Sequence, residues 1–592
     1  MNVLHGQRDD LDAFWWLSLS PRNADYGRIP DGCLPFDLGC EHGVNLDDVS
    51  ENRMRPGDEC IVYHPFTLAA DSFLGFGVGC DTCLEVWLNG ERIYSNCPGF
   101  DGLQQFASAE DHGFTGLGRK GDNLLAVRLT HGRGKCIFFI REKSYEAAHA
   151  SLPLRLVVDT GQVIGHIKPM NAVNNGPIGE MGGRGNLALW QTAQIPWCRT
   201  HDASFCGAYG GEHTVDIQAV FPDFAKDAEA PDSYHFSETD RYLKKIREGG
   251  SRVFYRLGSK IEHAPEKYGT QVPADFRKWA VICEHIIRHF NEGWADGFHW
   301  NIEYWELWNE PDHLLEENGN PTWQGTPEQF FELYRVAATH LKRCFPHLKI
   351  GGPALRGRDI GWAERFLSAL TSDGVRTPLD FLSWHVYAPS PAIYSMGRRY
   401  RRLLDSYGYE RTESVLDEWN YARGKGVEEF NRSIRCILGM KGAAFTCAAM
   451  CAGQNSPIDM MMYYDARPSV YNGLFDFYTF RPLKTYFVFR CWSLLAELEN
   501  QIAVDTQDKS GLFAVGAAQD GRVRLLLSRF FEEQFTPDDL EVRIVCKDAP
   551  LDGARLFLLD DSNDLTEIPF DRTPEGEIVF RMGANTVAFL EK

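Results

Sequence analysis

Two motifs in this sequence place a glutamate directly after a short apolar run. The first ends in Asn309-Glu310 and the second in Asp417-Glu418, so the two glutamates lie 108 residues apart. Two carboxyl groups that flank a glycosidic bond can serve as proton donor and as nucleophile at the anomeric carbon. A lone glutamate in such a place is usually a solvated surface group. The presence of both motifs together therefore predicts that Glu310 and Glu418 cleave a glycosidic bond.

Aromatic residues accompany both glutamates. Tryptophan and tyrosine rings stack on the apolar faces of sugars, while asparagine and histidine side chains bind the hydroxyl groups. Three tryptophans beside the motifs are therefore candidate stacking platforms, although any one of them could equally belong to the core: Trp308, Trp323 and Trp419.

Short apolar runs alternate with longer helical periods between about residues 160 and 498, and this alternation predicts a (β/α)8 barrel. The expected strands are 163–170, 196–200, 251–257, 302–308, 348–352, 379–387, 414–418 and 459–464. The expected helices are 238–248, 273–294, 327–345, 361–372, 427–440 and 481–499.

Reactive groups of such a barrel lie where its strands end. Glu310 ends the expected fourth strand and Glu418 the seventh, so the fold would bring them to one mouth. Two other strand ends carry candidate substrate-binding residues, which are His201 with Asp202 and His385 with Tyr387. The long loop that begins at His201 is expected to form a wall of the pocket.

The flanks of the barrel have the alternating pattern of antiparallel strands. An Asn-Gly pair at 89–90 lies between two such runs and predicts a hairpin. The fold class is therefore a TIM barrel flanked by N-terminal and C-terminal β-sandwiches. The expected divisions are a segment at 1–32 that packs on the other domains, a jelly-roll sandwich at 33–150, the barrel at 151–499 and a second sandwich at 500–592.

Composition limits the class of protein. With 61 Lys+Arg against 82 Asp+Glu, the net charge of −21 disfavours a nucleic-acid partner. No apolar run reaches the roughly 18 residues of a membrane span, and the start lacks the pattern of a signal peptide. The 16 scattered cysteines indicate reduced thiols and hence the cytoplasm. No cluster has metal-ligand spacing, so neither a metal nor a cofactor is expected, while a homo-oligomer stays open.

Residues 304–311, Tyr-Trp-Glu-Leu-Trp-Asn-Glu-Pro, resemble the acid/base motif of clan A glycoside hydrolases. Further motifs look like family 39, the family of β-xylosidases and α-L-iduronidases. These motifs are Arg-Thr-His-Asp at 199–202, Trp-x-Gly-Thr-x-Glu at 323–328, Gly-Gly-Pro at 351–353 and Trp-His-x-Tyr at 384–387. The resemblance covers about residues 160–500.

The resemblance implies roles for individual residues. Glu310 would be the general acid/base and Glu418 the nucleophile, while Asn309 would bind the sugar 2-hydroxyl. His385 and Tyr387 would line the subsite that holds the sugar to be released. We also expect the charge of Glu418 to raise the pKa of Glu310.

Asp417 takes a place where many relatives have threonine, and we expect it to pair with a barrel arginine such as Arg199.

The activity implied by the resemblance is that of a retaining exo-glycoside hydrolase on short oligosaccharides or glycosides, most similar to a β-xylosidase. An α-L-arabinofuranosidase, a β-galactosidase or an α-L-iduronidase could use the same site, as could a transglycosidase. A uronic acid would need a cationic clamp, for which Arg199, Arg256, Lys260 and Arg467 are candidates. A non-catalytic carbohydrate-binding protein is the alternative from another class, but it predicts that one of the two glutamates is missing.

Overall fold

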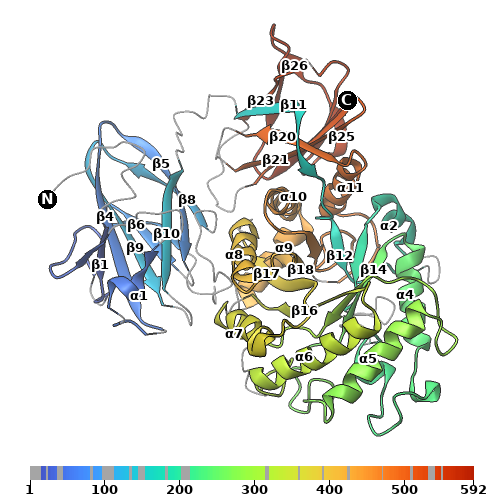
Figure 1. Ribbon diagram of the computed structural model, residues 1–592. Helices are drawn as coiled ribbons and strands as arrows, with labels where there is room; N and C mark the ends of the chain where they lie inside the picture. The colour runs from blue at the N-terminus through green and yellow to red at the C-terminus, as the bar shows by residue number, and fades with distance from the viewer. Residues whose placement is uncertain are drawn as a thin grey trace.

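A computed structural model shows a barrel accompanied by two β-rich domains (Figure 1). It describes the chain apart from residues 1–14, 22–23, 37–43, 52, 56, 81–83, 96–111, 132–135, 144–153, 180–184, 202–213, 314–318, 358–359, 390–392, 423–426, 470, 507–510, 531–539 and 549–550.

The N-terminal domain is a sandwich of two antiparallel sheets, as expected. Its elements are β1 (Trp15–Ser18), β2 (Leu34–Phe36), β3 (Val44–Asn45), α1 (Leu46–Val49), β4 (Glu59–Leu68), β5 (Ser72–Cys80), β6 (Leu84–Leu88), β7 (Glu91–Ser95), β8 (His112–Gly118), β9 (Gly121–Thr130) and β10 (Ile137–Lys143). One sheet has the order β2-β1-β4-β9-β6-β7 and the other β3-β10-β5-β8.

Two details of this sandwich bear on the sequence predictions. The hairpin β6–β7 turns at Asn89 and Gly90, whose φ angles of 55° and 83° are the positive values that such a turn requires. Part of the segment 1–32 is wrongly predicted, because Trp15 is fully buried in the sandwich core and its strand pairs with β4. Residues Trp15–Ser18 are a strand of this domain rather than a separate packing element.

Eight parallel strands close the central barrel, as the alternation predicts. They are β12 (Ala172–Asn174), β13 (Trp197–Arg199), β14 (Arg252–Leu257), β15 (Tyr304–Leu307), β16 (Lys349–Leu355), β17 (Phe381–Ala388), β18 (Glu413–Tyr421) and β19 (Met460–Tyr463). Seven of them contribute to a separate cluster of buried side chains, which consists of Ala172, Trp197, Phe254, Tyr304, Phe381, Val415, Met460 and Met462. This layer fills the barrel, so a site can be built only at a mouth.

Helices cover the outside of the barrel (Figure 1). They are α2 (Leu187–Ala193), α3 (Ile217–Val220), α4 (Ser237–Glu248), α5 (Phe276–Asn291), α6 (Pro327–Cys344), α7 (Ile360–Leu370), α8 (Ile393–Ser406), α9 (Val427–Leu438), α10 (Met440–Gln454) and α11 (Lys484–Ala496). Local sequence sets several starts. Asp275 caps α5, and Thr326 with Gln329 forms a capping box at α6. Helix α10 escaped prediction because its apolar residues surround the whole helix, which is buried on every side.

The C-terminal domain is built on one ten-stranded sheet. Its strands are β11 (Leu154–His166), β20 (Asn500–Asp505), β21 (Leu512–Gln519), β22 (Arg522–Arg529), β23 (Leu540–Cys546), β24 (Arg555–Leu559), β25 (Asp564–Ile568), β26 (Asp571–Arg572), β27 (Ile578–Met582) and β28 (Thr586–Glu591). Their order is β25-β24-β28-β22-β21-β20-β11-β23-β27-β26. Side chains from strands near both ends of the sheet pack into one hydrophobic core. Helix α10 of the barrel packs against β21, β22 and β28.

The first barrel strand lies elsewhere than predicted. Residues 163–170 were expected to form it, but β11 runs to His166 and pairs with β20 and β23 of the C-terminal sheet. The barrel begins instead at Ala172, in β12, which pairs with β13 and β19. The sequence of an apolar strand does not show which sheet the strand joins. Residues 154–166 therefore could not be assigned from the sequence, and in the structure they belong to the C-terminal domain although they precede the barrel.

Within the described residues, no single helix is both long and apolar enough to cross a bilayer. Only the pair Phe430–Leu438 and Met440–Gln454, bent by 82°, passes that test together.

The close approach of β16 to β17 gives a testable prediction. A Cβ on Gly351 would lie 2.3 Å from the backbone oxygen of Phe381. Gly351→Ala should therefore lower the free energy of unfolding by about 2 kcal/mol or more. The control Gly161→Ala should change it by less than about 0.5 kcal/mol, because its Cβ would meet only atoms at 3.5 Å or beyond. Unfolding followed by tryptophan fluorescence reports on the barrel, and equal losses in both variants would contradict the packing argument.

Candidate active site

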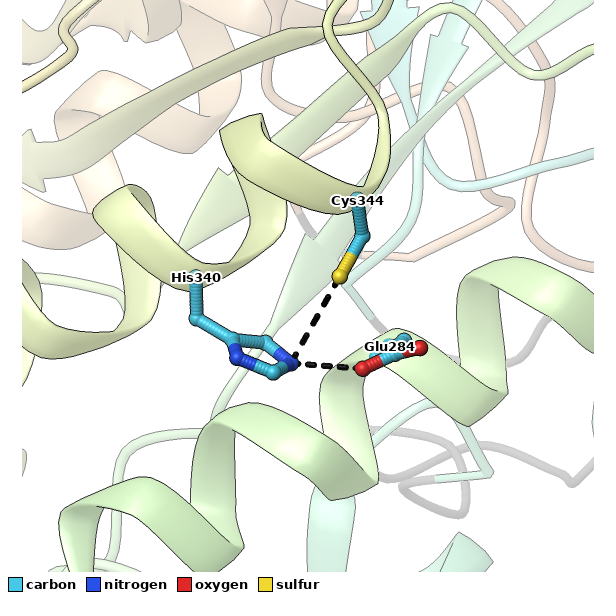
Figure 2. A group of neighbouring side chains, drawn as sticks. All are labelled: Glu284, His340 and Cys344. Atoms are coloured by element: carbon cyan, nitrogen blue, oxygen red, sulfur yellow. Dashed lines mark hydrogen bonds and ion pairs between the residues drawn. The ribbon is translucent and has the colours of Figure 1, made fainter.

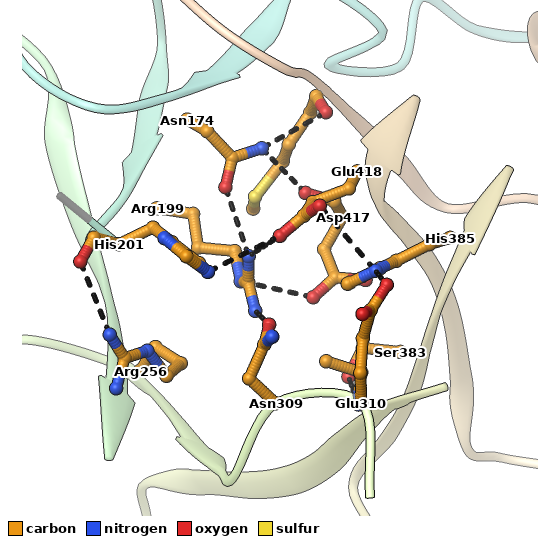
Figure 3. Close-up of polar contacts among 12 residues, drawn as sticks. Asn174, Arg199, His201, Arg256, Asn309, Glu310, Ser383, His385, Asp417 and Glu418 are labelled. Carbon is orange, nitrogen blue, oxygen red and sulfur yellow. Dashed lines mark hydrogen bonds and ion pairs between the residues drawn. The ribbon is translucent and has the colours of Figure 1, made fainter. Parts of the chain in front are cut away.

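The barrel mouth is organised around one fully buried guanidinium, that of Arg199 at the end of β13 (Figure 3). Its side chain binds four acceptors from other strands: Nε donates to Glu306 Oε2 at 2.7 Å, Nη1 donates to Asn174 Oδ1 at 3.0 Å and to Glu418 Oε1 at 2.8 Å, and Nη2 donates to Asn309 Oδ1 at 2.7 Å. A charge so deeply buried is stable only when its donors are matched in this way. The arginine therefore fixes both predicted motifs relative to each other.

Glu418 lies in β18 and has polar contacts through both of its carboxylate oxygens. Besides the Arg199 contact on Oε1, Oε2 accepts a hydrogen bond from the Tyr387 hydroxyl at 2.9 Å. His201 Nε2 lies 3.7 Å from Oε1. The carboxylate is thus held on both oxygens, which fixes the direction in which it can attack.

Glu310 is aimed into the same mouth by a turn directly after β15. Trp308 and Glu310 have φ angles of 82° and 49°, which is an unfavourable region for residues other than glycine. The turn is pinned because the Glu310 backbone N–H donates to the Ala354 oxygen and its carbonyl accepts from the Thr322 hydroxyl. Strained backbone held by its surroundings is typical of functional sites.

The two glutamates meet across His385. Its Nδ1 lies 2.8 Å from Glu310 Oε1 and 3.5 Å from Glu418 Oε2. One ligand atom from each of these three side chains lies within 4.8 Å of the other two. The two predicted carboxyl groups are therefore neighbours, as the resemblance implies.

The charges of this group overturn one expectation. Burial alone would lower the pKa of His385, but Glu418 and Asp417 raise it well above its usual value. Burial would raise the pKa of Glu310, yet the hydrogen bond and charge of His385 lower it below the usual range of glutamate. We expected Glu418 to raise this pKa. The sequence did not show that His385 would carry a positive charge and contact Glu310. Its effect on the pKa of Glu310 outweighs that of the Glu418 anion.

Asp417 lies beneath the nucleophile and pairs with Arg199, as expected, with Oδ2 3.0 Å from Nε. Glu306 of β15, which had no assigned role, shares this Nε and is fully buried too. Asn174 was missed because the first strand was misplaced. Its side chain reaches Arg199 only when the chain is in the register of β12.

The three candidate tryptophan platforms are wrong as stacking surfaces. Trp308, Trp323 and Trp419 are at most 1% exposed and belong to the main core. The Trp308 ring packs on Trp323, and its Nε1 donates to the Thr322 oxygen, so no face is left for a sugar. Residues along a strand alternate between the two sides of the barrel wall, and the Trp419 ring points outward onto Phe445 of α10.

Half-buried tyrosines stand beside Glu418 instead. Tyr387, Tyr464 and Tyr471 form a group with ring centroids 6.3–6.5 Å apart. Tyr464 also packs edge-on against His201. These rings supply the aromatic wall that the tryptophans do not. Asp202 and the following loop to 213 lie outside the described residues.

A second cluster could hold a metal by distance alone. Glu284 of α5 and His340 with Cys344 of α6 present ligand atoms within 4.8 Å of one another (Figure 2). However, Arg343 donates to His340 Nδ1, which places the imidazole proton on Nε2, and that atom lies 2.6 Å from Glu284. Both ring nitrogens are thus engaged, so this donor set fits an ion-pair network on the helix surface better than a metal site.

Comparisons with known proteins support the resemblance. Residues 212–416 match the family model described as glycosyl hydrolases family 39. A β-xylosidase of Geobacillus stearothermophilus is 28% identical over 228 residues, which cover 35% of this chain and 41% of that protein. A β-xylosidase of Caldicellulosiruptor saccharolyticus is 32% identical over 173 residues, or 28% and 33% of the two chains. The resemblance to family 39 is confirmed over residues 212–416, which are part of the barrel, and the matches span less than half the length of these relatives.

Solved structures support the fold. The crystal structure of a glucosidase from Croceicoccus marinus superposes with a TM-score of 0.59 at 22% identity, covering 74% of this chain and 98% of that one. At this identity the likeness shows a shared architecture of barrel and β-sandwich.

The raised pKa of His385 predicts how stability depends on pH. A histidine whose pKa is raised by folding stabilises the protein fully below its unfolded value near ~6.5, and this contribution is lost as pH rises through the folded value. The difference in melting temperature between wild type and His385→Gln should therefore be largest at about pH 6 and shrink toward alkaline pH. His347→Gln, at an exposed position, is the control and should show no such trend. A difference that grows with pH would contradict a charged His385.

Proposed function

We propose that this protein is a retaining glycoside hydrolase that releases a terminal sugar from short oligosaccharides or glycosides. The observation that carries the proposal is the approach of Glu310 and Glu418 to within 4.8 Å across the barrel mouth. Retaining enzymes hold their two carboxyl groups about 5–5.5 Å apart, whereas inverting enzymes leave room for a water at about 6.5–9.5 Å. The match of residues 212–416, which include Glu310, to family 39 supports the same mechanism.

In the first step Glu418 would attack the anomeric carbon while the glycosidic oxygen leaves. The Arg199 and Tyr387 contacts hold the carboxylate in place, so little reorganisation is needed at the moment of attack. Asn309 is fixed through Arg199 and would bind the sugar 2-hydroxyl. Hydrogen bonds to that hydroxyl strengthen as the ring gains oxocarbenium character.

The leaving oxygen needs a proton. In the enzyme without substrate, this proton is bound to His385. The imidazolium donates to Glu310 at 2.8 Å, and the nearby charge of Glu418 holds the proton on the ring. Forming the glycosyl ester removes that charge, which weakens the hold of His385 on its proton. In this same step, as the bond to the leaving oxygen breaks, the proton passes through Glu310 to that oxygen, so that Glu310 remains the group that touches the substrate.

In the second step Glu310 would act as base and activate a water that attacks the glycosyl ester. Glu418 is then released as a carboxylate, and the proton of the water returns to the pair formed by Glu310 and His385. Because these two groups are coupled, the basic limb of the activity profile should belong to the pair rather than to one residue.

The sugar is more consistent with a neutral pentose or hexose than with a uronic acid. Of the arginines considered as a clamp, Arg199 is occupied by buried acceptors and Arg256 forms a 2.6 Å ion pair with Asp216. Arg467 lies 3.3 Å from Asp465. A β-xyloside is the first choice, because the two curated relatives reported above are β-xylosidases. An α-L-arabinofuranoside, a β-galactoside and an α-L-iduronide are the alternative substrates, and each should be assayed beside the β-xyloside.

Exo action and location belong to the proposal as well. The site residues are deeply buried, with Glu418 only 6% exposed, which favours a pocket for a chain end over an open groove. All twelve cysteines among the described residues are free thiols, which favours a reducing compartment such as the cytoplasm. The presence of both carboxyl groups in reacting geometry favours an enzyme over a non-catalytic carbohydrate-binding protein. A panel of aryl glycosides with product analysis would identify the sugar and separate hydrolysis from transglycosylation.

The nucleophile can be tested by covalent trapping. Glu418→Ala should reduce turnover of an aryl β-xyloside by several orders of magnitude, because no other carboxylate can form the ester. A slow 2-fluoro glycoside should label Glu418 in wild type, as peptide mass spectrometry would show. Label on Asp417 or Glu413 would contradict the assignment. So would an inverted first product in NMR.

The acid/base can be tested by leaving-group dependence. Glu310→Ala should slow substrates with poor leaving groups by about 100-fold or more, and activated aryl glycosides far less, since these need no proton. Azide should restore turnover of the activated substrates, because this anion attacks the ester without a general base. Equal losses for good and poor leaving groups, without rescue by azide, would show that Glu310 is not the acid/base.

A further inference from the structure

Two fully buried carboxyl groups lie below Glu418. Glu306 points inward from β15 and Asp417 from β18, and both side chains are 0% exposed. Arg199 Nε carries a single hydrogen, yet it lies 2.7 Å from Glu306 and 3.0 Å from Asp417. One hydrogen cannot satisfy two buried anions.

The count of acceptors sharpens this conflict. The Arg199 hydrogen is donated to Glu306 Oε2, which leaves both oxygens of Asp417 buried without a hydrogen-bond donor. Glu306 has a further neighbour in Ser383, whose hydrogen bond lowers the pKa of Glu306. The nearest other cation to Asp417 is His385, whose Nε2 lies 3.5 Å from Oδ1. Two ionised carboxylates cannot bond to each other, because each is only an acceptor. A buried carboxylate with no donor is strongly destabilising.

We infer that Glu306 and Asp417 share one proton, with Glu306 as the neutral acid that donates to an ionised Asp417. The proton converts a repulsive contact into a short charge-assisted hydrogen bond. It also leaves one anion, Asp417, to face the two cations Arg199 and His385. Glu306 is thus a positioning residue that acts through Asp417, and its role in catalysis rests on the proposed function.

The electrostatic surroundings agree with this assignment. Burial and the charge of Asp417 raise the pKa of Glu306 well above its usual range, against the opposing effects of Arg199 and Ser383. Burial would raise the pKa of Asp417 too, but Arg199 and His385 lower it. Arg199 and His385 therefore both face Asp417, whereas Glu306 faces only Arg199, the cation that the two carboxyl groups share.

The consequence for the reaction lies in the charge of His385. Asp417 keeps its covalent state through the proposed cycle, whereas Glu418 becomes an ester and Glu310 exchanges protons. The buried carboxyl group of Asp312 also interacts with His385, but burial raises the pKa of Asp312 to about 7. Asp417 would therefore keep the imidazole oriented and basic enough to recover its proton after each turnover. Without the proton on Glu306, a second fixed anion would hold the imidazolium too tightly to release it.

The test compares two isosteric changes. Glu306→Gln replaces the acid by a neutral amide that can still donate to Asp417 and accept from Arg199, so kcat should fall by about tenfold or less. Asp417→Asn removes the anion, and kcat should fall by about 100-fold or more. Asp417→Asn should also move the basic limb of the pH profile to lower pH, because His385 loses a stabilising charge. Glu306→Gln should leave that limb in place, a distinction that a merely structural role would not produce.

Two further measurements do not depend on turnover. The infrared difference spectrum of wild type minus Glu306→Gln at pH 7 should contain the carbonyl band of a protonated carboxylic acid. Glu306→Leu should lower the melting temperature far more than Glu306→Gln, because leucine leaves Asp417 without a donor. If the band is absent, or if Glu306→Gln harms the protein as much as Asp417→Asn, the shared proton is wrong. If the band is present and no glycoside is cleaved, the proposed function fails while the shared proton stands.

Discussion

The site depends on one constraint, which is that the buried Arg199 guanidinium must meet an acceptor at each nitrogen. Taking such a cation out of water costs several kcal/mol unless the geometry of its partners is nearly complete. Its acceptors come from β12, β15, the turn after β15 and β18, which are separated by more than 240 residues between Asn174 and Glu418. Closing the barrel is therefore the same event as assembling the site. The positions of the two glutamates follow from satisfying the arginine.

Charge at the mouth is balanced locally, although the chain as a whole carries −21. Each of four carboxyl groups, those of Glu306, Glu310, Asp417 and Glu418, lies within 3.0 Å of Arg199 or His385. In a site of low dielectric, the position of each proton then changes the electrostatic energy of the whole group. His385 links Glu310, the proposed acid/base, to Asp417 and Glu418. The protonation of each residue is thus a property of the group rather than of its own side chain. This is why a pairwise expectation for Glu310 and Glu418 gave the wrong sign.

Short-range patterns in the sequence predicted a large part of this arrangement. Alternating apolar and helical periods located seven of the eight barrel strands, and strand ends then indicated which residues would share the mouth. The same patterns could not tell which wall of the barrel a tryptophan faces, because a one-residue change of register reverses its direction. They also could not assign residues 154–166 to a sheet, since the pairing partners lie more than 330 residues further along. Both failures concern contacts that only the closed fold defines.

The place of β11 between β20 and β23 has a consequence for how the chain is made. This strand leaves the ribosome before any part of the barrel, and its partners follow only after the barrel is complete. The C-terminal sheet therefore cannot close during synthesis until the last 100 residues have emerged. An unpaired apolar strand is exposed throughout that interval and is a natural target for chaperones or for aggregation. Because β11 precedes the barrel and the other strands of its sheet follow it, the C-terminal domain consists of two separate segments of the chain. A single recombination event therefore cannot exchange this domain between relatives.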